Sequence, residues 1–278
     1  KRQVPAGDLQ DWQTPPFEAT IVGDYLVGRG VQDDKGPSLA ALYAVKSLLD
    51  DGIQFTKRIR FIFGTDEETL WRCMNRYNQI EEQADLGFAP DSSFPLTYAE
   101  KGLLQVKLHG PGWDDLPLQA GQALNVVPDK ATYAGHRLEE LLPVLDQSGV
   151  QYSQTENSVT VLGISKHSKD AAEGVNAIVG LAESLSLIQP HPALLFIADA
   201  VGEDATGEAL FGRITDEPSG DLSFNLATLV IDQEQSEIGI DIRIPVLADK
   251  DALVARLQEI AASYQLEYEE FDYLAPLY

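Results

Sequence analysis

The sequence predicts an α/β protein in two parts. In residues 37–90, segments with helical and strand-like patterns alternate at the spacing typical of a mostly parallel sheet flanked by helices. After Lys101, helices are interleaved with strands of alternating apolar and polar residues, a pattern typical of an α+β domain with an antiparallel sheet. We therefore predict a first domain over residues 1–104 and a second over 105–273, with residues 274–278 beginning a return to the first.

The elements of the first part follow from local signals. Residues 14–30 carry Pro and Gly around short β-rich runs, which predicts a hairpin. Pro37 suits the first turn of a helix over residues 37–50, whose apolar side chains recur at helical spacing until Gly52 ends it. A strand is then predicted over 57–65, a helix over 69–83 and a short strand over 86–90.

The second part reads as strands and helices that are longer and more regular. The stretch 103–110 alternates as a half-buried strand, and residues 224–232 and 237–246 form a hairpin around a turn at 233–236. Further strands are predicted over 157–165 and 266–273, and helices over 135–149, 173–188 and 250–264.

Composition limits the function. Of the residues 44% are hydrophobic, as in ordinary globular proteins, and the net charge of −24 argues against nucleic acid or an anionic membrane as a partner. No apolar run reaches the ~20 residues that a membrane span needs. The single cysteine, Cys73, cannot form an internal disulfide and fits a reducing compartment, so we expect a cytoplasmic protein. Nothing in the sequence predicts the oligomeric state.

Acidic residues follow the strand-like runs of the first part. Asp33 precedes the first helix, Glu67 and Glu68 follow the strand that ends near Phe63, and Asp91 follows the stretch 86–90. In an open α/β sheet, ligands bind beyond the carboxyl ends of the strands. Clustered carboxylates raise one another's pKa unless a cation neutralises them, so the pattern indicates a metal site.

Two questions stay open from the residues alone. Oxygen ligands favour Mg, Ca or Mn, whereas Zn normally takes a histidine as well, and all four histidines lie in or at the border of the second part. A row of acids is also, with equal weight, a solvated turn of an acidic protein.

An ordered set of motifs resembles the M20 metallopeptidases, and most closely the PepV-like (Xaa-His) dipeptidases. The first part carries "GRGVQDDKGPS", "FIFGTDEETLW", "APDSSFP" and "YAEKG", and the second carries "LNVVPDKA", "GISKHSKDAAEGVNAI" and "IDIRIPV". The resemblance covers nearly the whole chain. It implies a catalytic domain over 1–104 and a lid domain over 105–273.

The resemblance assigns roles in the catalytic domain. It implies two zinc ions, with manganese or cobalt as possible substitutes, bridged by Asp33 and bound further by Glu68 and Asp91. Glu67 would be the general base that takes a proton from the attacking water and delivers it to the leaving amine. Asp66, beside them, is expected to cap the following helix or to remain solvated.

In the lid, the resemblance implies contacts to a dipeptide substrate. His167 would donate to the oxyanion of the tetrahedral intermediate, and Asn125 would be a second polar contact. Arg243 would bind the terminal carboxylate in a bidentate pair that Lys cannot reproduce. A surface histidine, an asparagine bonded to its own backbone and an Arg243–Asp241 ion pair are the structural alternatives.

The chain departs from the family at two metal positions. The family's "HxD" pair falls on Arg2 and on a position before residue 1, and its last metal histidine falls beyond Tyr278. We therefore expect a piece of a longer zinc dipeptidase that is inactive alone. The alternatives are an N-acyl amino acid deacylase of the same family and a non-catalytic binding or assembly module, and the forms "PDSSFP" and "YAEKG" favour the dipeptidase.

Overall fold

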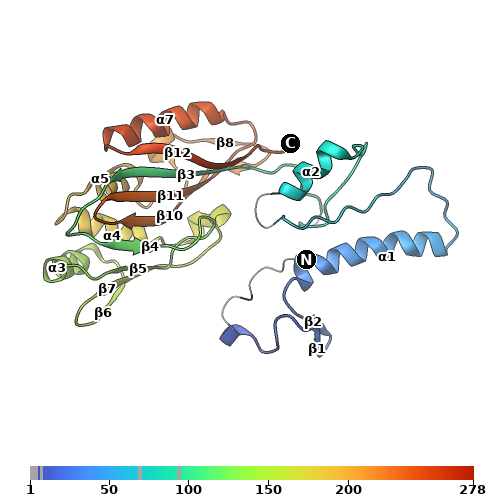
Figure 1. The fold of residues 1–278 in the computed structure, drawn as a ribbon, viewed down its shortest axis with the longest axis horizontal. Coiled ribbons are helices and arrows are strands. Elements are labelled where there is room, and N and C mark those ends of the chain that lie inside the picture. The colour runs from blue at the N-terminus through green and yellow to red at the C-terminus, as the bar shows by residue number, and fades with distance from the viewer. Residues whose placement is uncertain (1–5, 7–8, 68–70, 93–94) are drawn as a thin grey trace. The chain divides into compact units, whose positions relative to one another are not determined.

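The computed structural model describes residues 6, 9–67, 71–92 and 95–278, which form two compact units, Lys1–Thr97 and Tyr98–Tyr278. Figure 1 shows the elements of each. Strand β3 (Gly102–Pro111) lies whole in the second unit. That the units are a catalytic and a lid domain stays a prediction.

The first unit contains the predicted hairpin and both predicted helices. Strands β1 (Thr20–Val22) and β2 (Tyr25–Val27) pair antiparallel, and the short turns η1 (Leu9–Asp11) and η2 (Val31–Lys35) flank them. Helix α1 (Gly36–Asp50) begins with Pro in its first turn, as expected. Helix α2 (Arg72–Ile80) is shorter than the predicted 69–83.

The predicted parallel sheet is wrong for the described residues, where all strand pairs are antiparallel. Neither residues 57–64 nor residues 86–90 form a strand. Phe61 and Phe63 stay 37% and 66% exposed. A strand needs a neighbour to supply its ladder of hydrogen bonds. Alternating apolar residues indicate only a local preference for a strand. They do not determine whether another segment lies alongside to pair with it.

The second unit is built on antiparallel sheets, as predicted. Its main sheet has the strand order β12-β3-β11-β10-β4, a three-stranded sheet has the order β5-β7-β6, and β8 pairs with β9. The bounds of these strands, β3 excepted, are β4 (Leu118–Ala120), β5 (Lys130–Tyr133), β6 (Tyr152–Gln154), β7 (Val159–Leu162), β8 (Thr215–Asp216), β9 (Gly220–Asp221), β10 (Ser223–Ile231), β11 (Gln235–Ile244) and β12 (Glu267–Leu274).

Helices cover one face of the main sheet. Figure 1 shows α4 and α5 behind β11 and β10, and α7 beside β12. The helical segments of this unit are α3 (Leu138–Ser148), η3 (Ser168–Glu173), α4 (Ala177–Ser186), α5 (Pro192–Leu195), η4 (Phe196–Val201), α6 (Glu208–Phe211) and α7 (Lys250–Ser263). Of the helices in the described residues, none is long and apolar enough to cross a membrane.

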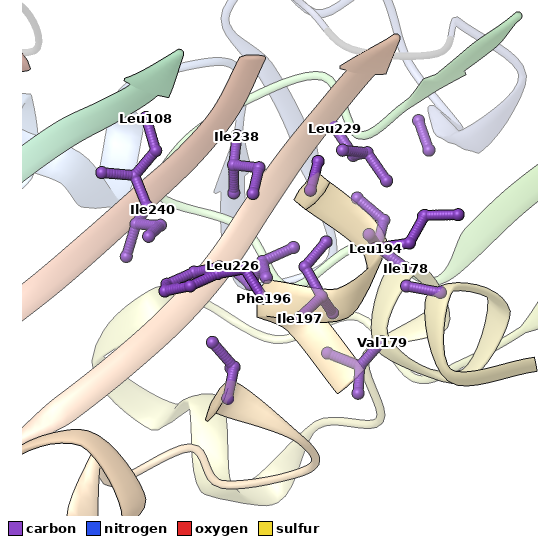
Figure 2. Packing of buried hydrophobic residues seen from close by; sticks show 14 of the residues in the cluster. Leu108, Ile178, Val179, Leu194, Phe196, Ile197, Leu226, Leu229, Ile238 and Ile240 are labelled. Carbon is purple, nitrogen blue, oxygen red and sulfur yellow. The ribbon is translucent and has the colours of Figure 1, made fainter. Parts of the chain in front are cut away.

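The core lies between this sheet face and the helices. Alternate residues of the strands point inward, so that Leu108, Ile238 and Ile240 meet Phe196 and Ile197 of η4 (Figure 2). All five are 0% exposed. Fully burying such a side chain contributes about 1.5–3 kcal/mol. The opposite face of the same strands carries polar residues, because successive side chains of a strand point to opposite faces.

Side-chain caps fix where the helices begin. Asn176 starts α4 by accepting hydrogen bonds from the N–H groups of Ile178 and Val179, at 3.0 and 3.3 Å. Asp249 starts α7 in the same way, accepting from Asp251 and Ala252 at 3.0 and 3.1 Å. Such caps are typically worth about 1 kcal/mol each, since they satisfy donors that a helix leaves unpaired.

A buried histidine starts α5. His191 is 1% exposed, its Nδ1 accepts from the N–H of Ala193 at 3.1 Å, and its Nε2 donates to the carbonyl of Pro111 at 3.0 Å. Burial lowers the pKa of His191 below its ordinary value, and the contact with Pro111 offsets this in part. The folded protein therefore holds this ring neutral.

We expect this histidine to make the second unit less stable in mild acid. Above pH 6.5 the ring is neutral in both states; as the pH falls through 6.5, the unfolded chain takes a proton that the folded state refuses, so the free energy of unfolding falls. Urea unfolding between pH 7.5 and 5.5 measures this. His191→Asn keeps a cap acceptor and cannot titrate, so its stability should fall less over that range. Equal losses in the two proteins would contradict the prediction.

Candidate functional site

Two chain segments of the second unit lie side by side at the candidate lid site. Residues 125–127 pair antiparallel with residues 166–168, through a bridge between Val126 and His167. The N–H of Ser168 donates to the carbonyl of Asn125 at 2.9 Å, and the N–H of Val127 donates to the carbonyl of Lys166 at 2.8 Å. This pairing brings the two motifs "LNVVPDKA" and "GISKHSKDAAEGVNAI" together.

His167 is held in one tautomer at the start of η3. Its Nδ1 accepts from the N–H of Lys169 at 3.2 Å, so the neutral ring carries its proton on Nε2. That Nε2 has no hydrogen-bond partner among the residues the structure describes. The pKa of His167 is lowered, first because part of the ring is shielded from water and then by the positive charge of Arg243. At neutral pH, His167 therefore offers an uncommitted neutral N–H donor.

Arg243, on β11, is held by two partners. Its Nε donates to Asp241 Oδ1 at 2.7 Å, and its Nη2 donates to Asp241 Oδ2 at 3.2 Å and to Ser168 Oγ at 3.1 Å. Its side chain is 21% exposed. Within the described part of the chain, Nη1 makes no hydrogen bond. The ion pair with Asp241, which was the structural alternative to a substrate contact, is thus present, and it leaves donors of the guanidinium without a partner among the described residues.

The structure brings three predicted site residues together. Ser168 links them, because it follows His167 in the chain, bonds the backbone of Asn125 and accepts from Arg243. The side chains of Asn125 and His167 are exposed. The place therefore gathers an amide, a neutral imidazole N–H and a guanidinium. Such a set can bind a carboxylate and an oxygen that develops negative charge.

The predicted acidic residues of the first unit are not gathered in the same way. Asp33 lies in the turn η2, Glu67 lies in the segment before α2, and Asp91 lies in a loop. All three are exposed. Glu68 lies outside the described residues. Among the residues that are described, no three His, Cys, Asp or Glu side chains are grouped closely enough to hold a metal.

Asp66 caps the next helix, as predicted. Its Oδ2 accepts from the N–H of Arg72, the first residue of α2, at 3.1 Å. It also accepts from Nε and Nη2 of the same arginine at 2.6 and 2.7 Å. These bonds commit Asp66 to the helix start. Asp66 therefore has a structural role in the acidic triplet, different from the catalytic role expected of Glu67.

The described residues therefore do not by themselves fit a zinc site. The acids that the resemblance assigns to zinc supply oxygen only, and two of them, Asp33 and Asp91, belong to no described cluster of ligands. Catalytic zinc normally takes nitrogen ligands as well. Zinc thus rests on the resemblance alone, and we assign no chemical step to it.

Four residues next to the candidate lid site were not predicted as site residues. Ser168, Gln105 and Asn225 were not singled out, and Asp241 was considered only as a pairing partner. The signal was present for Asp241, because Asp241 and Arg243 lie two apart in a predicted strand and so share a face. Ser168 and Asn225 act through backbone groups far away in the sequence, which no local pattern shows.

The second unit also contains a cavity of about 370 Å³. It is lined by residues 127, 171, 172, 174–176 and 179, by the stretch 201–206 and by the strand residues 224–226. None of Asn125, His167 and Arg243 is among its lining residues. Asn225, which binds the carbonyls on either side of Asn125, is among them, so the cavity borders the candidate lid site.

Comparison with known proteins gives a consistent result. The family model described as "Peptidase family M20/M25/M40" matches residues 3–274. "Putative dipeptidase YtjP" of Bacillus subtilis (strain 168) is 36% identical over 275 residues, which cover 90% of this chain and 58% of that protein. "Putative dipeptidase SH1171" of Staphylococcus haemolyticus (strain JCSC1435) is 32% identical, covering 96% of this chain and 62% of that protein.

A solved structure is also similar. It is the M20 family metallo-carboxypeptidase Sso-CP2 from Sulfolobus solfataricus, with a TM-score of 0.44 and 17% sequence identity. The match covers 99% of this chain and 63% of that chain. The chain thus spans about six tenths of the length of the proteins it matches here.

Proposed function

Because the chain belongs to peptidase family M20/M25/M40, we propose that the protein hydrolyses the peptide bond of unblocked dipeptides. The names of the relatives support a dipeptidase. The observation that carries the proposal is the meeting of Asn125, His167 and Arg243 around Ser168. A dipeptide offers a terminal carboxylate and, during hydrolysis, an oxyanion for these groups to bind.

In this proposal each residue of the candidate lid site binds a different group of the substrate. Arg243 binds the terminal carboxylate, for which its uncommitted Nη1 donors are suited. His167 donates from Nε2 to the oxyanion, and the lowered pKa keeps the ring neutral when no substrate is bound. Asn125 donates to a second polar group of the substrate. Together these contacts would be strongest when negative charge develops on the substrate, which is when they accelerate the reaction.

Glu67 supplies the general base in this proposal. Its carboxylate takes a proton from the attacking water and passes it to the leaving amine. The family resemblance assigns this role to Glu67, whereas the neighbouring Asp66 binds Arg72 at the start of α2. Zinc held by Asp33, Glu68 and Asp91 is part of the proposal through the family resemblance.

The test uses the full-length gene product with two kinds of substrate. We expect it to hydrolyse alanyl-alanine, to lose activity after treatment with a chelator, and to regain it with zinc, manganese or cobalt. N-acetyl-alanine should be a poor substrate. Hydrolysis of N-acetyl-alanine alone would assign a deacylase. Binding of alanyl-alanine without hydrolysis in the metal-loaded protein would assign a binding module.

A further inference from the structure

The polar face of the main sheet carries a row of residues beneath the lid site. Asp241 on β11 lies opposite Gln105 on β3 and opposite Asn225 on β10. Asp241 is 0% exposed and Asn225 is 1% exposed. Buried carboxylates and amides persist in proteins when they bind partners, so their partners indicate what they do.

A shift in strand register creates this row. The pairing of β10 with β11 changes between Leu226 and Thr228. If the register of the Thr228–Gly239 pair continued unchanged, Ile242 would lie opposite Asn225. Instead the bulge places Asp241 there, so that an amide and a carboxylate share one face. Bulges are common next to active sites, where they redirect side chains.

Asp241 fixes the plane of the Arg243 guanidinium. Its two oxygens accept from Nε and Nη2 of Arg243 at 2.7 and 3.2 Å, and Oδ2 also accepts from Gln105 at 2.9 Å. Gln105 thereby fixes the carboxylate from the other side. A guanidinium bound on one edge by a fixed carboxylate can turn its remaining donors in only one direction.

Asn225 fixes the backbone that presents Asn125. Its Nδ2 donates to the carbonyl of Leu124 at 2.9 Å and to the carbonyl of Val126 at 3.0 Å. These carbonyls lie on either side of Asn125, whose own carbonyl accepts from Ser168. The carbonyls of three successive residues, 124–126, are thus hydrogen-bonded. These bonds fix the backbone from which the exposed side chain of Asn125 projects.

We propose that Asp241 and Asn225 are positioning residues: Asp241 orients the guanidinium of Arg243, and Asn225 orients the backbone at Asn125. Both act on the substrate through another residue, so the proposal rests on the proposed function. It explains why a sheet face holds a fully buried charge opposite a buried amide. The carboxylate of Asp241 holds the guanidinium of Arg243 in one orientation. The amide of Asn225 holds the backbone at Asn125 in one orientation.

The first test is a double-mutant cycle in the full-length protein. Asp241→Asn should lower kcat/KM for alanyl-alanine roughly tenfold, mainly by raising KM, because Asn lacks the negative charge and has one acceptor oxygen where Asp241 uses two for Arg243. Alanyl-alanine amide should be affected little. In an Arg243→Lys background, Asp241→Asn should cause no further loss. Asp146→Asn, at an exposed position of the same unit, is the matched control.

Asn225 is tested by the same logic. Asn225→Leu removes both donors, and Asn225→Ser, the milder variant, keeps one. Each should lower kcat/KM for alanyl-alanine, about tenfold for Leu and less for Ser, and neither should add to the loss caused by Asn125→Ala. Thermal unfolding shows whether each variant is folded. Losses that add in full to that of Asn125→Ala would overturn the proposal for Asn225, and an Asp241→Asn loss that is equal on the amide would overturn it for Asp241.

A spectroscopic readout makes the test independent of hydrolysis. In the folded wild-type chain, the Nε–H proton of Arg243 should exchange slowly with water, because it is bonded to a buried carboxylate. Asp241→Asn should speed that exchange tenfold or more while leaving Arg213 unchanged. Unchanged exchange at Arg243 would overturn the positioning role. An inactive wild type with this signature would instead refute only the proposed function.

Discussion

Replacing Glu67 with Gln in the full-length protein is expected to lower the hydrolysis of unblocked dipeptides by two decades or more. A glutamine cannot take a proton from the attacking water, and removing a general base typically costs roughly 10²–10⁴-fold. Binding of alanyl-alanine and the metal content should change little, because the substitution keeps the size of the side chain. Steady-state kinetics, calorimetric binding and metal analysis measure the three quantities.

The matched control for this variant is Glu81→Gln. Glu81 is another exposed glutamate of the first unit, so its substitution makes the same change of charge without touching the acidic triplet. Its activity should equal that of the wild type. If Glu67→Gln kept a tenth or more of the wild-type rate, Glu67 would not be the base.

The second unit could be predicted from sequence because its signals are local. Strands β3 and β11 alternate over ten residues, and α7 repeats its apolar positions over fourteen. These lengths suffice for a period to show. Strands such as β4, with three residues, and helices such as α5, with four, are too short to show one.

The first unit shows the limit of the same reasoning. Residues 57–64 have the composition of a strand, yet they form no strand and pair with none in the part of the chain that is described. Helix α1 is also predicted correctly, but none of its side chains is buried. Local pattern thus predicted the hairpin and the helices of this unit correctly, whereas the strands it predicted over 57–65 and 86–90 do not form in the described residues. It could not predict the sheet, because a sheet depends on which segments meet.

In the candidate site, too, local contacts could be predicted from sequence and long-range contacts could not. Arg243 and its partner Asp241 could be placed on one face of a strand from their spacing alone. The opposition of Asn225 and Asp241 could not, because it depends on a bulge that changes the register by one residue. The bonds from Asn225 to the carbonyls near Asn125 join residues 99 and 101 positions apart. Only the folded chain shows such contacts.

Replacing Arg243 with Lys is expected to lower kcat/KM for unblocked dipeptides by about two decades. Lys keeps the charge, but a single ammonium cannot at once bind Asp241, Ser168 and a substrate carboxylate, as the planar guanidinium is placed to do. Hydrogen bonds to charged groups contribute about 1.5–3 kcal/mol, and each 1.4 kcal/mol corresponds to a tenfold change. The loss should be mainly in KM, because the substrate carboxylate does not react.

The amide of the same dipeptide distinguishes substrate binding from structure. Alanyl-alanine amide has no terminal carboxylate, so the wild type should hydrolyse it poorly and Arg243→Lys should reduce that rate little further. Arg213→Lys, whose side chain is 70% exposed in the same unit, is the control and should leave both rates unchanged. An equal loss on dipeptide and amide would mean that Arg243 holds Asp241 and Ser168 in place and does not bind the carboxylate. In that event the variant should also unfold at a lower temperature, because the buried carboxylate of Asp241 would lose its ion-pair partner.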